Sequence, residues 1–118
     1  MKPFSLFYVR FPAGCEGMVY GITGVDNEGN YTVAIDSAQD EETQKFALKH
    51  ELSHIHLGHF DPDNKKPLTE IEQEADEHAE RMTEEELNYL LTFCRKKEVK
   101  PPGFMEEYEA KKANAQPA

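Results

Sequence analysis

The first third of the chain alternates between apolar and polar positions in a way that is typical of β-strands. Aromatic and β-branched residues concentrate in 5–11 (SLFYVRF) and 17–23 (GMVYGIT), which predict two short strands. Residues 31–36 (YTVAID) carry an apolar side chain at every second position and predict a half-buried strand. The turn signal NEGN at 27–30 precedes that strand, so we expect it to be the second arm of a hairpin.

The hydrophobic period changes to that of a helix at about Asp40. Residues 41–57 contain neither proline nor glycine, and Gly58 follows as a helix stop. After a polar loop at 61–68, a second helix is predicted from Thr69 to Met82. A capping box at 83–86 (TEEE) predicts the start of a third helix. The apolar face of this third helix is expected to comprise Leu87, Leu90, Leu91 and Cys94.

Strands followed by helices predict an α+β fold in which a small antiparallel or mixed sheet packs on the helix of residues 41–57. A chain of 118 residues suits one domain, which we expect to span residues 1–100. The sequence PPG at 101–103 breaks the chain there. Residues 101–118 are therefore predicted to form an extension with a short helix near 104–112 and a disordered tail.

Composition narrows the range of functions. The net charge of −10 opposes binding to nucleic acid or to an anionic membrane, because both are polyanions. No run of about twenty apolar residues is present, and the N-terminus does not have the pattern of a signal peptide. Cys15 and Cys94 match no paired metal-binding spacing, so we expect free thiols and a cytoplasmic protein.

Four of the five histidines lie in residues 49–59 (KHELSHIHLGH). His50 and His54 are separated by about 40° on a helical wheel, so both rings project from one helix face. That face also carries apolar residues, namely Phe46, Ala47 and Leu57, and is expected to point inward. Two imidazoles at this spacing can bind one small cation such as zinc. Glu51 flanks the pair and is expected to contact a water molecule there as a general base rather than to bind the metal.

The other histidines have different expected roles. His56 shares the polar face of the helix with Lys45, Lys49 and Ser53, which places it in solvent. His59 follows Gly58 and is expected just beyond the helix end, where it can cap carbonyl groups or interact with the helix dipole. His78, in the second helix, is expected to be a partly buried core residue.

A third metal ligand is expected downstream of the histidine pair. The metzincin pattern HExxHxxGxxH is excluded, because Leu57 and Phe60 stand where it requires glycine and histidine. Glu72 lies at one edge of the apolar stripe of the second helix, and Glu74 at the other, as an alternative ligand. Asp76 lies one turn after Glu72 and could orient a ligating histidine. Glu72 could instead cap its own helix, since residues 69–72 (TEIE) also match a capping box.

HELSH at 50–54, followed by a loop and ExEAD at 72–76, resembles the ImmA/IrrE-type family of small bacterial zinc metallopeptidases. The resemblance covers about residues 11–82 and implies a minimal zincin-like fold. It also implies that zinc is bound by His50, His54 and Glu72, with Asp76 in a supporting role. The substrate it implies is a protein, often a transcriptional repressor in members linked to mobile elements. His78 departs from the family pattern, in which Phe is usual.

The sequence therefore predicts a zinc-dependent endopeptidase that cleaves a protein substrate. The alternative is a non-catalytic zinc-containing module that binds a regulator. No DNA-binding segment is apparent, so direct contact with nucleic acid is not expected. An extended substrate would pair with a sheet edge, for which residues 31–36 are the candidate strand. The candidates for a donor that stabilises the oxyanion are Tyr20, Tyr31, His78 and Tyr89.

Overall fold

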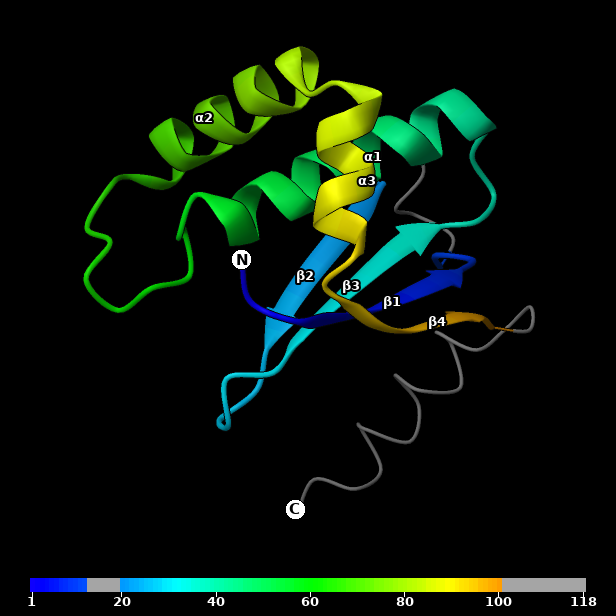
Figure 1. The fold of residues 1–118 in the computed structure, drawn as a ribbon, viewed down its shortest axis with the longest axis horizontal. Helices are drawn as coiled ribbons and strands as arrows, with labels where there is room; N and C mark the ends of the chain where they lie inside the picture. Colours follow the sequence, from blue (N-terminus) through cyan, green and yellow to red (C-terminus); the bar gives the residue numbers. More distant parts are fainter. Residues whose placement is uncertain (13–19, 101–118) are drawn as a thin grey trace.

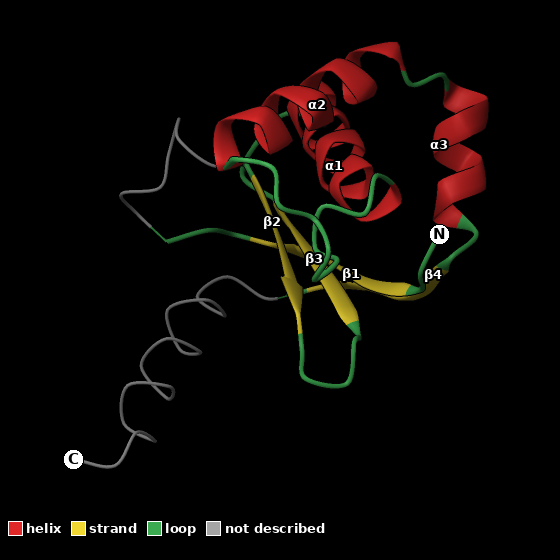
Figure 2. Ribbon diagram, turned by 90° about the vertical axis from the view of Figure 1, so that its left-hand side faces the viewer, coloured by secondary structure: helices red, strands yellow, loops and turns green. Residues whose placement is uncertain are grey.

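The computed structural model describes residues 1–12 and 20–100, which form a four-stranded sheet and three helices. The strands are β1 (Phe4–Val9), β2 (Gly21–Val25), β3 (Tyr31–Asp36) and β4 (Cys94–Val99), and the helices are α1 (Glu41–His56), α2 (Leu68–Arg81) and α3 (Glu84–Leu91). The three helices lie on one face of the sheet (Figure 2). This arrangement confirms the predicted α+β class.

The sheet has the strand order β2-β3-β1-β4. β2 and β3 form the predicted antiparallel hairpin, whereas β1 runs parallel to both β3 and β4. The hairpin turn is closed by Asp26, whose carboxylate accepts hydrogen bonds from the backbone N–H groups of Glu28 and Asn30. Gly29 has a φ of 83°, a conformation that glycine adopts readily.

The strand predicted as the edge for an extended substrate is an interior strand. β3 pairs with β2 on one side and with β1 on the other, so both of its backbone edges are occupied. The prediction was wrong because the sheet order depends on the parallel β1–β3 pairing, which alternation within one strand does not reveal. β2 is instead the terminal strand at this end of the sheet (Figure 1).

The third helix is shorter than predicted, and a strand follows it. Thr83 caps α3 by accepting a hydrogen bond from the Glu86 backbone N–H, as the capping box indicated. The helix ends at Leu91, however, and Cys94 begins β4 rather than extending the helical apolar face. The backbone N–H of Phe4 donates to the Phe93 carbonyl at 3.1 Å, which starts the pairing between β1 and β4.

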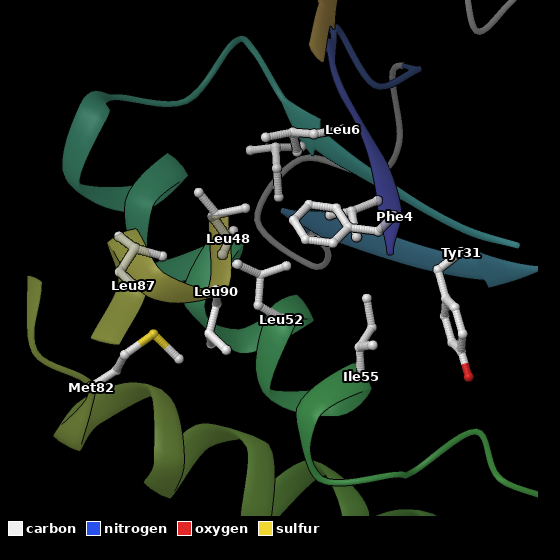
Figure 3. Close-up of a cluster of buried hydrophobic side chains, with 12 residues drawn as sticks. Phe4, Leu6, Tyr31, Leu48, Leu52, Ile55, Met82, Leu87 and Leu90 are labelled. Carbon is white, nitrogen blue, oxygen red and sulfur yellow. The ribbon is translucent and has the colours of Figure 1, made fainter. Parts of the chain in front are cut away.

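The core lies between the sheet and α1 and continues to α3 (Figure 3). Phe4 and Leu6 from the sheet meet Leu52 of α1, and each of the three is at most 1% exposed. α2 packs on α1 through Ala75 and Ala79, which are 0% and 1% exposed. α1 therefore contacts both the sheet and α2. The helix face that carries His50 and His54 points toward β2 and α2.

Two of the predictions concern residues outside those that the structure describes. Cys15 lies in residues 13–19, and the predicted C-terminal extension is residues 101–118. Cys94 is a free thiol, as expected. None of the helices that the described residues form is long and apolar enough to cross a membrane.

Candidate metal centre

α1 presents His50 and His54 one turn apart on the face that points toward β2 and α2. The helix begins at Asp40, whose carboxylate accepts a hydrogen bond from the Thr43 N–H, and it continues without interruption through both histidines. The two Nε2 atoms lie 3.1 Å apart. The His54 side chain is 7% exposed and that of His50 is 15% exposed, so the pair lies at the base of an opening rather than on an open surface.

α2 brings Glu72 to the same point. Its Oε2 atom lies 2.9 Å from His50 Nε2, and its Oε1 atom lies 3.3 Å from His54 Nε2. The alternative role as a helix cap is wrong, because α2 begins after Pro67 and its N-terminus has no side-chain cap. Ligand atoms around a tetrahedral zinc ion are separated by about 3.4 Å, which is close to these distances.

The hydrogen bond between His50 and Asp76 determines which histidine nitrogen faces Glu72. Asp76 Oδ1 lies 2.7 Å from His50 Nδ1. An ionised carboxylate can only accept a hydrogen bond, so Nδ1 carries the proton and Nε2 presents a lone pair to Glu72. Asp76 thus occupies the place expected of a residue that orients a ligating histidine.

A second chain of hydrogen bonds fixes the orientation of His54. Glu74 Oε1 accepts from His59 Nε2 at 2.9 Å, so the other nitrogen of His59 can accept from His54 Nδ1, also at 2.9 Å. His54 Nε2 therefore presents a lone pair toward His50 and Glu72. Lys66 donates to the other Glu74 oxygen at 2.6 Å and lowers the pKa of that carboxyl. With both oxygens bonded elsewhere, Glu74 does not lie among the converging ligand atoms.

His59 caps the end of α1 as predicted, since its backbone N–H donates to the His54 carbonyl at 3.0 Å, but its ring has a second role. Its ring is 1% exposed and contacts His54 and Glu74 instead of helix carbonyls. Gly58, with a φ of 72°, turns the chain after α1, and the backbone N–H groups of Gly58 and His59 donate to the carbonyls of Ile55 and His54. The sequence shows only that His59 directly follows a glycine that ends the helix. Which way the His59 ring points depends on the backbone turn at Gly58, which the sequence does not reveal.

His50 Nε2, His54 Nε2 and the Glu72 carboxylate direct lone pairs at one point, an arrangement that suits the binding of a cation. Without positive charge between them, the His50 and His54 nitrogens and the Glu72 carboxylate would repel one another. Two histidines and one glutamate are a ligand set typical of catalytic zinc sites. Glu51 also offers an oxygen within 4.8 Å of both histidines, yet its nearest approach to His50 Nε2 is 4.0 Å, longer than that of Glu72.

β2 holds Glu51 beside the point of convergence. The Thr23 hydroxyl donates to Glu51 Oε1 at 2.7 Å, which leaves Oε2 directed toward the histidines. A Cβ atom at Gly21 would lie 3.0 Å from Glu51 Cγ, so glycine permits the close approach of strand and helix there. Neither residue was identified from the sequence, because both lie in a strand far from the helix along the chain.

Burial changes the proton affinities of two groups in this region. Desolvation raises the pKa of the Glu51 carboxyl above its ordinary value, although the hydrogen bond from Thr23 opposes the change. Desolvation, and next the neighbouring His50, lowers the pKa of His54 to about 4. His54 is therefore neutral at pH 7, which is the form that binds a metal.

An open cleft of about 650 Å³ leads to the convergence point. Apolar side chains line much of it: Ile22 of β2, Phe46 of α1, Phe60 of the following loop, and Leu68 and Ile71 of α2. Phe46 and Leu57 are 41% and 40% exposed, so of the apolar residues predicted to point inward with the histidines only Ala47 is buried. Of the four predicted oxyanion donors, Tyr20 lines the cleft and the other three do not.

The remaining histidines, His56 at the end of α1 and His78 in α2, do not line the cleft. His56 is exposed and His78 is half-buried, as predicted. Their rings stack at a centroid distance of 5.4 Å. Ser53, which was predicted on the polar face with His56, is instead 0% exposed, because α2 covers that part of α1.

A family model described as the IrrE N-terminal-like domain, Peptidase_M78, matches residues 11–113. The chain belongs to this metallopeptidase family. The Peptidase_M78 assignment confirms the family indicated by HELSH and ExEAD. No curated protein and no solved structure gave a significant match.

Proposed function

We propose that the protein is a zinc-dependent endopeptidase that hydrolyses a peptide bond in a protein substrate. The observation that carries the proposal is the convergence of lone pairs from His50, His54 and Glu72 beside the buried carboxylate of Glu51. These three residues would hold the zinc ion, with Asp76 orienting His50. When bound, zinc supplies Lewis acidity that activates water and polarises a carbonyl oxygen.

Glu51 performs the proton transfers in this proposal. Its Oε2 atom accepts a proton from the attacking water and later delivers that proton to the leaving amine. The raised pKa of its carboxyl favours both steps, because a group that titrates closer to neutral pH accepts and releases protons readily. Thr23 holds the other carboxylate oxygen and so keeps Glu51 in place.

We further propose that the substrate binds as an extended segment along β2. Among residues 1–12 and 20–100, no strand pairs with the outer side of β2, so its backbone groups are available to a peptide. The apolar walls of the cleft would accept hydrophobic side chains next to the cleaved bond. Tyr20, at the cleft, is the remaining candidate to donate a hydrogen bond to the oxyanion. A transcriptional repressor is the partner that the family resemblance implies.

The test compares the wild type with Glu51→Gln in the presence of zinc. Both proteins are incubated with a library of unstructured peptides, and the new termini are identified by mass spectrometry. We expect one zinc ion at the His50–His54–Glu72 site in both proteins, and cleavage rates lower by about 10²–10⁴-fold in the variant, the usual contribution of a general base. Equal cleavage by both proteins would contradict the role of Glu51. Zinc binding by both, with every peptide and the cognate regulator left intact, would instead identify the non-catalytic interaction module.

A further inference from the structure

His56 and His78 take no part in the proposed reaction, yet they meet at a junction of three helices. His56 lies at the end of α1 and His78 near the end of α2, and Glu86 of α3 completes the group. One potential ligand atom from each of the three residues lies within 4.8 Å of the others. We call these three residues the junction cluster.

The distances inside the junction cluster are short enough for a shared ligand. His78 Nε2 lies 3.1 Å from Glu86 Oε1, and the rings of His56 and His78 are inclined by only 28°. His56 is exposed, while the side chains of His78 and Glu86 are 22% and 37% exposed. The histidine and carboxylate of α2 and α3 are therefore already in contact, and the exposed His56 ring can move to join them.

Ser53 fixes the orientation of His78. Its hydroxyl donates to the Lys49 carbonyl at 2.7 Å and therefore has no proton left for His78 Nδ1, also at 2.7 Å. His78 Nδ1 must then donate to the serine oxygen, which is 0% exposed and cannot exchange this bond for water. A neutral His78 consequently directs the lone pair of Nε2 at the Glu86 carboxylate.

Two acceptors 3.1 Å apart repel each other unless a proton or a metal ion lies between them. We propose that the junction cluster binds a second divalent transition-metal cation of the zinc, cobalt or nickel class through His56, His78 and Glu86, with water completing the coordination. Imidazole and carboxylate together are suited to these metals. The cation ties α2 and α3 to α1 and so stabilises the packing of the helix that carries Glu72. This proposal does not depend on peptidase activity.

The test is a titration of the full chain with zinc in competition with a chromophoric chelator. We expect two equivalents in the wild type, and a melting temperature that rises again as the second equivalent binds. His56→Ala should retain one equivalent, and its exposed side chain leaves no cavity when it is removed. Loss of an outer partner alone weakens metal binding by about 10–100-fold, so loss of a direct ligand should weaken the second event at least as much.

Two further variants separate ligand loss from unfolding. Glu85→Gln alters an exposed carboxylate next to the cluster and should leave both equivalents unchanged. His50→Ala should lose the first equivalent and keep the second, which can be recognised in the cobalt-substituted protein by its own absorption bands. A wild type that binds one equivalent, or a second equivalent of equal affinity in His56→Ala, would overturn the proposal. The contact between His78 and Glu86 would then be an ion pair.

Discussion

At the scale of single residues, the proposed zinc site depends on side chains that do not touch the converging lone pairs. Asp76 sets the tautomer of His50, and Glu74 sets that of His54 through His59. Each chain of hydrogen bonds ends at a carboxylate, which can only accept. The direction of every proton therefore follows, and both Nε2 atoms are left free to bind a cation.

Replacement of His59 tests the hydrogen-bond chain that runs from His54 through His59 to Glu74. In His59→Leu the buried Nδ1–H of His54 loses its acceptor, which costs about 1–3 kcal/mol and allows the ring to turn. Zinc affinity at the proposed site should fall by about 10–100-fold. Competition with a chelator of known affinity measures the change.

Glu74→Gln is the matched control for that variant. The glutamine side-chain oxygen can still accept from His59 Nε2, so the tautomers are preserved and the loss of affinity should be smaller. If His59→Leu bound zinc as tightly as the wild type, the ring of His54 would be held by its own packing, and the hydrogen-bond chain would have no role.

Gly21 and Gly24 provide a second comparison within one strand. A methyl group at Gly21 would lie 3.0 Å from Glu51 Cγ, whereas one at Gly24 would meet nothing within 4 Å. Gly21→Ala should displace Glu51 and lower kcat/KM by roughly tenfold or more, since misplacement by about 1 Å can cost about 10²-fold. Zinc content should not change. Gly24→Ala should behave like the wild type in the same peptide assay, and an equal loss in both variants would indicate a general effect on β2.

At the scale of elements, the position of Glu72 depends on how closely α2 approaches α1. The contact is made by Ala75 and Ala79, which are almost fully buried. Ala75→Leu should force the helices apart, destabilise the fold by about 1–3 kcal/mol and weaken zinc binding, because Glu72 and Asp76 move with α2. Urea unfolding and zinc competition measure the two effects.

The control for this variant is Gln73→Leu, a change to the same side chain at an exposed position of the same helix. It should leave both stability and zinc affinity close to the wild type. If Ala75→Leu lost stability but kept full zinc affinity, the approach of the two helices would not determine the position of Glu72.

The elements that the sequence predicted correctly are those with local signals. Hydrophobic period, a turn motif and a capping box located α1, α3 and the β2–β3 hairpin, and one helical turn placed His50 beside His54. β4 was missed because CRKKEV is mostly polar, and its strand state comes from parallel pairing with β1 at the other end of the chain. Thr23 was missed for a similar reason, since its bond to Glu51 joins residues 28 positions apart.

At the scale of the whole molecule, the cleft has carboxylates on its walls without basic side chains to balance them. Glu51, Glu72 and Asp76 line it, and no lysine or arginine does among the described lining residues. The full chain carries a net charge of −10, so the rest of the molecule has no net positive charge to offset these three carboxylates. A bound cation would offset their charge, and folding and metal binding should therefore be coupled.

That coupling predicts a lower melting temperature when zinc is removed. The His56→Ala background isolates the site of His50, His54 and Glu72, because it lacks the exposed ligand of the junction cluster. At free zinc a hundredfold above Kd, binding should stabilise the folded state by about 2.7 kcal/mol. Chelation should then lower the melting temperature by about 4–8 °C for each kcal/mol lost, as measured by calorimetry. Adding His50→Ala to this background should abolish the response, and equal melting with and without zinc would show that the carboxylates tolerate one another without a cation.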